Sequence, residues 1–363
     1  MNIKFNIPLR FVENDKGMAL LITLSVITVM IAATLELNRK ARVAVFSAAS
    51  ARDRYTLSTM ASSGINVAKA MLVKDKMESE IDSIQEDWSN TEKVSAALET
   101  ISFQQGSVTF KIEDELGKIQ ANALVTFPES RKFNEAQRIM WDRFLRLFIS
   151  PDFLETDSNP AAIISSVKDW LDSGDDEAIT GLNGAESGYY QGLDPGYPCK
   201  NGLFHDLSEL LLVKGIMPEF YYGTEEMPGI SEYMTVGGIT STGDGKFTFD
   251  GKININTAKL PVLSALMPEG YEDLAPLIDE YRREADQEIY IHDLSGSTWY
   301  KKVPGCSDLK IDPGLITTSS DIFRIESTAS LNDMKLTITT VILREQDKKD
   351  KRWRCKVLYV KCS

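Results

Sequence analysis

The longest run of apolar positions lies near the N-terminus of the chain. No charged residue occurs between Lys16 and Glu36, and a helix of about 20 apolar residues is long enough to cross a bilayer core of roughly 30 Å. The residues before this run include basic side chains, which favour the cytoplasmic side of a membrane. The pattern therefore predicts one membrane-spanning helix, residues 18–37, with the larger part of the chain on the opposite side.

The helical pattern continues beyond the apolar run. Residues 18–75 contain no proline, and between Leu57 and Leu72 apolar residues recur at intervals of three and four, which is typical of one buried helix face. The sequence therefore predicts a single continuous helix over residues 18–75, apolar on all sides at first and amphipathic afterwards. Two alternatives are a signal sequence cleaved near Ala32 and Ala33, and a signal anchor followed by a separate helix.

Alternation of apolar and polar residues with period two indicates strands in two distant parts of the chain. The early segment, residues 107–112, leads into a turn and a second expected strand that ends near residue 122. The late strands are expected at residues 321–329, 334–344 and 353–360. Because a lone hairpin is only marginally stable, we expect the early pair and the late strands to form one small antiparallel sheet.

Helical periodicity dominates the region between these strands. The expected helices cover residues 132–149, 159–170, 206–215 and 274–285. In the third of them, Asp206 and Glu209 form a capping box. The whole pattern predicts an α+β fold, in which the long N-terminal helix packs on the small antiparallel sheet and a large α-helical domain is inserted. The head then comprises residues 76–127 and 316–363, and the inserted domain comprises residues 128–315.

The chain is acidic, with a formal net charge of −13 at pH 7. Such a charge repels the phosphate backbone of nucleic acids, although residues 253–258 (Ile-Asn-Ile-Asn-Thr-Ala) are a familiar opening of DNA-binding helix-hairpin-helix elements. The glycine hairpin of those elements is replaced by residues 267–270 (Met-Pro-Glu-Gly). We therefore expect a structural role for this segment, with Thr257 capping the next helix, and no nucleic acid as partner. The basic run from Lys348 to Lys356 is expected to be a solvated hairpin tip.

The sequence offers little material for catalysis. It has two histidines and neither a G-x-S-x-G nor an H-E-x-x-H motif, so we expect no enzymatic activity; a signal-anchored periplasmic enzyme is the less favoured alternative. The four cysteines lack metal-type spacing and suggest disulfides in an oxidising compartment. Cys355 and Cys362 are candidates for one pair within a C-terminal hairpin, which leaves Cys199 and Cys306, but all three connectivities remain open.

Carboxylates are concentrated after the expected helix that ends near Trp170. Asp172, Asp175 and Asp176 follow this helix, and Glu186 comes after a glycine-containing loop. Oxygen ligands on a flexible loop suit calcium, which takes six to eight oxygens, although the spacing is not that of an EF-hand. A solvated acidic loop is the alternative interpretation.

The N-terminus resembles the class III signal of type IV pilins and pseudopilins. A short basic leader ends in Gly17 and is followed by Met18 and the long apolar helix. The resemblance implies that a prepilin peptidase removes residues 1–17 and that the new N-terminus is methylated. Most of these proteins have glutamate at the fifth mature position, which is Ile22 here. One branch, the minor pseudopilin K family of the type II secretion system, characteristically lacks that glutamate.

Further segments resemble the same branch and occur in the same order. They are Asp169-Trp170-Leu171-Asp172 followed by Gly184-Ala185-Glu186, the helix Ser208–Ile216, the segment Asn254–Ala258 and the strand with Phe323-Arg324-Ile325. The resemblance implies a SAM-like helical insertion and calcium bound near Asp172, Asp175, Asp176 and Glu186. Ser187 stands where the family has an acidic residue, which implies a weakened or altered ligand set.

The function that the resemblance implies is structural. K-type pseudopilins are expected to cross the bacterial inner membrane once, with the body in the periplasm, as part of the general secretion pathway. There they cap the pseudopilus together with I- and J-type minor pseudopilins, nucleate its assembly from the major pseudopilin and limit its length. The alternative is a minor pilin or tip adhesin of a type IV pilus system.

Overall fold

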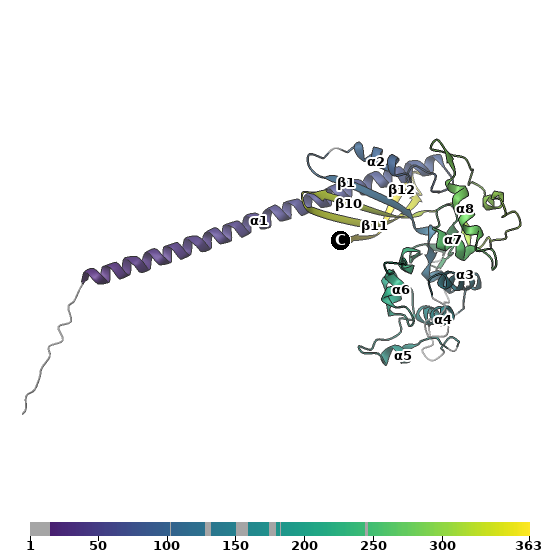
Figure 1. Ribbon diagram of the computed structural model, residues 1–363, viewed down its shortest axis with the longest axis horizontal. Coiled ribbons are helices and arrows are strands. Elements are labelled where there is room, and N and C mark those ends of the chain that lie inside the picture. Colours follow the sequence, from purple (N-terminus) through teal and green to yellow (C-terminus); the bar gives the residue numbers. More distant parts are fainter. Residues whose placement is uncertain are drawn as a thin grey trace, which may run out of the picture. The chain divides into compact units, whose positions relative to one another are not determined.

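The computed structural model describes residues 15–101, 103–127, 132–149, 159–173, 179–181, 183–243 and 246–363. The chain divides into two compact units, Met1–Thr59 and Met60–Ser363. The first unit holds the first part of helix α1 (Asp15–Glu78), and the second holds the remainder of α1, the sheet and the other helices (Figure 1).

Helix α1 confirms the predicted continuous helix and is a few residues longer at each end. Among the described residues it is the one helix that is long and apolar enough to cross a membrane, with a mean hydropathy of 2.4 in its most apolar window of 18 residues. No part of that window is buried within the protein. A core helix of a water-soluble domain would be covered by other elements, so α1 is a candidate membrane anchor.

Four strands form the predicted antiparallel sheet. Their order is β1-β10-β11-β12, with β1 at Ser107–Asp114, β10 at Ile322–Leu331, β11 at Met334–Gln346 and β12 at Trp353–Cys362. β1 pairs with β10 over its whole length, from Ser107 opposite Ser330 to Asp114 opposite Phe323. Alternate residues of β1, β10 and the second half of β11 are buried, as the period of two predicts.

The last part of α1 packs on one face of this sheet. A Cβ atom on Gly64 would lie 2.5 Å from Ser327 Oγ and 2.8 Å from Val108 Cγ1, so the helix backbone lies close against the sheet at this glycine. Near the other edge of the sheet, Cys355 Sγ lies 3.7 Å from the carbonyl oxygen of Lys69. Helix α2 (Thr91–Glu99) follows α1 and contacts β1.

The chain between β1 and β10 forms many short elements. The helices are α3 (Glu135–Arg146), α4 (Pro160–Leu171), α5 (Ser187–Gln191), α6 (Pro218–Tyr222), α7 (Leu260–Leu266) and α8 (Leu274–Arg283). The 3₁₀ turns are η1 (Glu115–Gly117), η2 (Ala121–Leu124), η4 (Leu207–Leu212), η5 (Ile230–Glu232) and η6 (Trp299–Lys302). The strand pairs are β2 (Ile119–Gln120) with β3 (Met234–Thr235), β4 (Ile239–Gly243) with β5 (Lys246–Phe249), β6 (Ile253–Asn254) with β9 (Ile316–Thr317), and β7 (Ala285–Asp286) with β8 (Ile289–Tyr290).

One hydrophobic core joins these short elements. Its largest buried side chains include Trp141, Phe144, Trp170, Tyr190 and Trp299, which come from α3, α4, α5 and η6. Figure 1 shows these helices gathered outside the sheet rather than layered over it. The α+β architecture with a helical insertion is therefore confirmed. The boundaries predicted for the head (76–127 and 316–363) and the insertion (128–315) stay a prediction, because residues 60–363 form one compact unit.

Three local predictions were wrong. The early strands do not form a hairpin: β2 has only two residues and pairs in parallel with β3, so the chain leaves the sheet at Asp114. Thr257 does not cap α7, which starts three residues later; its hydroxyl instead donates to Asp114 Oδ2 at 2.7 Å. The capping box of Asp206 and Glu209 is present, but it starts the 3₁₀ turn η4 rather than an α-helix.

Candidate functional site

The predicted processing and anchoring residues lie at the start of α1. Gly17 and Met18 are in the first turns of the helix, and residues 1–14 of the predicted leader lie outside the described residues. Ile22 is 59% exposed, like the other large apolar side chains of this segment. A leucine- and isoleucine-rich helix surface without a carboxylate is suited to lipid or to packing against similar helices.

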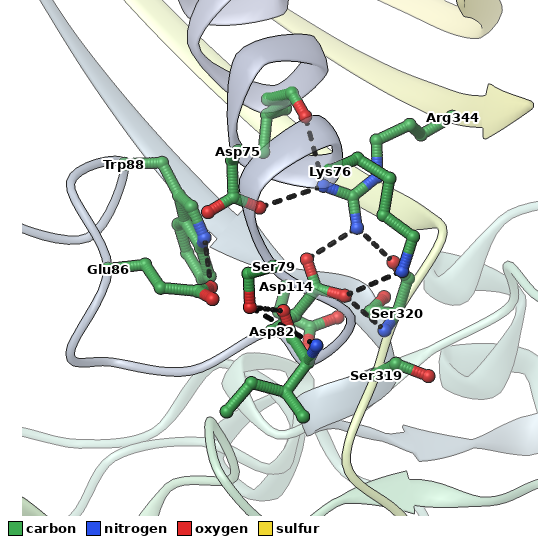
Figure 2. Close-up of polar contacts among 12 residues, drawn as sticks. Asp75, Lys76, Ser79, Asp82, Glu86, Trp88, Asp114, Ser319, Ser320 and Arg344 are labelled. Carbon is green, nitrogen blue, oxygen red and sulfur yellow. Dashed lines mark hydrogen bonds and ion pairs between the residues drawn. The ribbon is translucent and has the colours of Figure 1, made fainter. Parts of the chain in front are cut away.

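A buried polar cluster lies where α1 ends. We call it the junction network, and it consists of Asp75, Asp82, Glu86, Asp114 and Arg344 (Figure 2). Arg344 comes from the end of β11 and donates from Nη1 to Asp75 Oδ2 and to the carbonyl oxygen of Leu72, both at 3.0 Å. Its Nη2 donates to Asp82 Oδ1 and to the carbonyl oxygen of Ser320. One fully buried guanidinium thus ties α1 and the loop after it to the sheet.

The junction network continues into the inserted region. The side-chain amide of Asn254 in β6 donates to the carbonyl oxygen of Asp82 at 2.9 Å and to Asp114 Oδ2 at 2.7 Å. Asp82 Oδ2 also accepts from the backbone N–H of Ser320 at 2.8 Å. The Ile-Asn-Ile-Asn-Thr-Ala segment therefore serves as a structural connection to the sheet, because its asparagine and threonine side chains bond the carboxylate at the end of β1.

Burial raises the pKa values of three carboxylates in this network. Burial, together with the charges of Glu86 and Asp82, raises the pKa of Asp75 to about 7 in spite of Arg344. Burial also raises the pKa of Asp114 to about 6 and raises the pKa of Glu86. Asp75 and Asp114 are therefore poised to take up protons when the surroundings become mildly acidic.

Three of these carboxylates are close enough to hold a metal ion. One oxygen from each of Asp75, Asp82 and Glu86 lies within 4.8 Å of the others. However, Arg344 already donates to the two aspartates, and Glu86 Oε2 accepts from Trp88 Nε1 at 2.9 Å. Because a guanidinium holds the charge of the two aspartates, the geometry favours a structural ion-pair network over a metal centre.

A second buried ion cluster holds the start of the inserted region. Glu115 in η1 is 1% exposed and accepts from Arg324 Nε of β10 at 2.6 Å and from Lys118 Nζ at 3.1 Å. The hydroxyl of Thr235 in β3 also donates to this carboxylate. Burial opposes ionisation of Glu115, but the charges of Lys118 and Arg324 outweigh it and lower the pKa of Glu115.

The acidic segment after α4 is organised by Asp169 rather than by the predicted ligands. Asp169 is fully buried and its Oδ2 accepts from the backbone N–H of Ala185 at 2.9 Å, while Oδ1 accepts from that of Thr180 at 3.1 Å. A Cβ atom on Gly184 would lie 2.1 Å from Asp169 Oδ2. The glycine therefore permits the close approach that brings the far end of the segment back to the last turn of α4.

The four predicted calcium ligands are only partly described. Asp172 follows α4 directly, and its Oδ2 accepts from Lys168 Nζ at 2.6 Å. Glu186 is 3% exposed and immediately precedes α5. Asp175 and Asp176 lie outside the described residues. The two described residues lie at the two ends of the segment that Asp169 holds together. Both offer carboxylate oxygens, which suit a hard cation such as calcium. Calcium binding at this segment stays a prediction.

The predicted disulfide within the C-terminal hairpin is wrong for this structure. Cys355 and Cys362 both lie on β12, seven residues apart, which is about 23 Å along a strand at roughly 3.3 Å per residue. A disulfide requires Cα atoms within about 7 Å. Cys199 and Cys306 are buried and, like the other two, are free thiols.

Arg344 and its partners were not foreseen from the sequence. A signal was present, because Ile338, Thr340, Ile342 and Arg344 share the buried face of β11 by the period of two. An arginine at such a position requires a buried acidic partner. The sequence does not tell which of the 53 acidic residues provides it.

The long helix and the sheet indicate the structural class of the protein. A long N-terminal helix that is apolar at its start and packs its end on a small antiparallel sheet is the architecture of pilin-like subunits. The structure is similar to a chain of the crystal structure titled "GspK-GspI-GspJ complex from enterotoxigenic Escherichia coli Type 2 Secretion System". The match has a TM-score of 0.60 at 16% identity and covers 86% of this chain and 98% of that one. It shows the fold.

The family follows from the sequence of the inserted region. A family model described as "Type II secretion system (T2SS), protein K" matches residues 117–225, which include α3, α4, the acidic segment and η4. No curated protein sequence matches the chain significantly. Residues 117–225 thus carry the sequence of the type II secretion protein K family, and the fold of the chain agrees with that family, so both findings support the family predicted from the sequence. This family is a structural component of secretion.

Proposed function

We propose that this protein caps the tip of a type II secretion pseudopilus, where it nucleates assembly and limits length. One observation carries the proposal: Ile22 occupies the position of the usual glutamate on an exposed, apolar helix. In a filament each such glutamate is expected to pair with the N-terminus of the adjacent subunit. The topmost subunit has no such partner, and an unpaired carboxylate in lipid costs several kcal/mol.

The inserted region supports the same position. Residues 115–321 stand between two neighbouring strands of the sheet and carry most of the large hydrophobic core. A subunit of this bulk fits the end of a filament, where one side has no neighbour, better than its interior. The I- and J-type minor pseudopilins are the proposed partners at the tip, since the similar structure is a GspK-GspI-GspJ complex. The major pseudopilin is the proposed partner below them.

The proposal includes processing and placement. A prepilin peptidase cuts between Gly17 and Met18, the new N-terminus is methylated, and α1 anchors the body on the periplasmic side of the inner membrane. Calcium bound near Asp172 and Glu186, with Asp175 and Asp176, stabilises the inserted region. The same chain as a type IV pilus adhesin is less favoured because the family model belongs to type II secretion.

The test is the N-terminal mass of the membrane-bound chain, measured with and without prepilin peptidase. Two variants separate the possible cleavage sites: Gly17→Val blocks the proposed cut, whereas Ala33→Val blocks a signal-peptidase cut after the small residues of α1. We expect a methylated chain beginning at Met18 for the wild type and for Ala33→Val, and an intact leader for Gly17→Val. A mature chain that begins beyond Ala33 would remove the anchor and overturn the proposal.

A further inference from the structure

The last strand of the sheet has an exposed edge with an apolar centre. β12 is the final strand in the order β1-β10-β11-β12, and no described segment pairs with its outer side. Four consecutive residues in it, Val357, Leu358, Tyr359 and Val360, are 43–54% exposed. An edge strand presents unpaired backbone N–H and C=O groups, which are a template for another strand.

Charged side chains along an edge strand are one of the devices that protect it from pairing with another chain. In β12 the charges lie at both ends instead, with Arg354 and Lys356 before the four apolar residues and Lys361 after them. The register shift opposite Val341 and Ile342 leaves Leu358 as the extra residue of a bulge, so a bulge is the only protective device at the centre of the described strand. The apolar centre therefore remains available to a partner.

The surroundings of β12 are basic although the chain is acidic. From Glu345 to Ser363 there are seven basic and three acidic residues, whereas the whole chain has a net charge of −13. Arg354 pairs with Asp347 and Asp350. Among the described residues, Lys356 and Lys361 have no carboxylate within ion-pair distance, although Lys361 is near enough to help lower the pKa of Asp206.

We propose that the edge of β12 binds an extended, acidic segment of a partner protein by strand addition. The partner adds a fifth strand, packs apolar residues against Val357–Val360 and places carboxylates opposite Lys356 and Lys361. A second copy of the chain is a poor occupant, because two antiparallel β12 strands bring their basic ends together. An anionic membrane satisfies the charges but leaves the backbone groups of the edge unpaired.

The test uses the full chain in nanodiscs of phosphatidylcholine and two synthetic probes. One is a ten-residue peptide of alternating valine and glutamate, and the other has lysine in place of glutamate. Alternate N-methyl groups along one edge keep each peptide from pairing with itself. Amide hydrogen exchange is followed on β12 and on β1, the opposite edge of the same sheet, which carries Glu113 and Asp114.

We expect the glutamate peptide to slow exchange in β12 and not in β1, and to bind at least about tenfold more tightly than the lysine peptide. The double variant K356E/K361E should invert this preference. The control K301E/K302E changes the net charge equally at exposed lysines of η6 and should leave the preference unchanged.

Four results would overturn the proposal. They are no protection of β12 by the glutamate peptide, equal protection by both peptides, dimers of the chain that protect β12 without a peptide, and protection by phosphatidylglycerol nanodiscs alone. The double variant has a built-in check on its folding, because unchanged exchange in β10 and β11 shows that the sheet is intact.

Discussion

At the scale of single residues, the junction network shows how one buried arginine organises several segments. Arg344 contacts a helix carbonyl, two aspartates and a loop carbonyl that come from three separate parts of the chain. Removing one member of such a buried group leaves the others unpaired, which typically costs about 3–5 kcal/mol. The network therefore fixes the end of α1 relative to the sheet within residues 60–363.

The pKa of Asp75 makes this network sensitive to pH. Its pKa is raised from an ordinary 3.8 to about 7, so between about pH 4 and pH 7 the folded protein keeps a proton that the unfolded chain has released. The contribution of Asp75 to stability is thus present at low pH and is lost as pH rises toward 7. We predict that Asp75→Asn reduces the difference in Tm between pH 5 and pH 8.

The matched control is Asp87→Asn, which changes an exposed aspartate of the neighbouring loop. The pKa of Asp114 is also raised, to about 6. The Tm of the Asp75 variant should therefore still fall somewhat as pH rises. If Asp75→Asn and Asp87→Asn had the same pH profile, Asp75 would not be the group that takes up the proton.

Gly64 provides a second prediction at this scale. A methyl group there would overlap Ser327 and Val108 at 2.5 and 2.8 Å. Overpacking costs about 1–3 kcal/mol, which exceeds the gain of up to about 1 kcal/mol from replacing glycine by alanine in a helix. Gly64→Ala should therefore lower the free energy of unfolding in urea. Ser62→Ala, at an exposed position of the same helix, should not lower it; a stabilised Gly64→Ala variant would show that the helix and sheet move apart freely.

At the scale of elements, the helices and strands that could be predicted from the sequence are those in which a hydrophobic period repeats several times. α1, β1, β10, β11 and β12 each repeat a period often enough for the sequence to identify them. β2 and β3 have two residues each, so they contain no period, and the two-residue pairing of distant segments replaced the expected hairpin. The side chain of Thr257 likewise satisfies a tertiary partner, Asp114, instead of the local cap that its sequence position suggested.

The acidic segment after α4 gives the prediction at this scale. A ligand that binds only the folded protein, and not the unfolded chain, stabilises it by about 2.7 kcal/mol when the ligand concentration is a hundred times Kd. We predict a higher Tm in calcium than in chelator for the full chain in detergent, and a smaller difference for Asp172→Asn. The measured quantity is the calcium-dependent change, because loss of the Lys168–Asp172 ion pair itself lowers the Tm in chelator.

An exposed carboxylate elsewhere serves as the control for charge. Glu225→Gln, in the loop after α6, removes one negative charge and should leave the calcium response intact. Equal Tm values in calcium and chelator for the wild type would mean that the segment is a solvated loop held by Asp169 and Lys168 alone.

At the scale of the whole molecule, the sequence predicted the family because several segments occurred in one order. The long apolar helix and the late strands define the pilin-like part, and residues 117–225 carry the sequence of protein K. Glu115 with Arg324 ties the inserted region to the sheet, and Asp82 with Arg344 ties the loop after α1 to it; both pairs join residues more than 200 positions apart. No periodicity within the sequence records such pairs, which is why they became visible only in the structure.

The last prediction concerns the position of the molecule in the filament. At the tip no subunit lies above this one, so a glutamate at position 22 would neither gain nor displace a partner. The cost of several kcal/mol applies to a charged carboxylate in lipid, and the glutamate would avoid most of it by taking up a proton. We predict that Ile22→Glu supports protein secretion nearly as well as the control Ile22→Leu, and that both variants occur once per filament at its end. The measurement is secretion of a reporter, combined with immunogold labelling of isolated pseudopili. Wild-type protein distributed along the filament would contradict the tip position directly. Distribution along the filament for Ile22→Glu alone would mean that the missing carboxylate, rather than the bulk of residues 115–321, keeps this subunit out of the shaft.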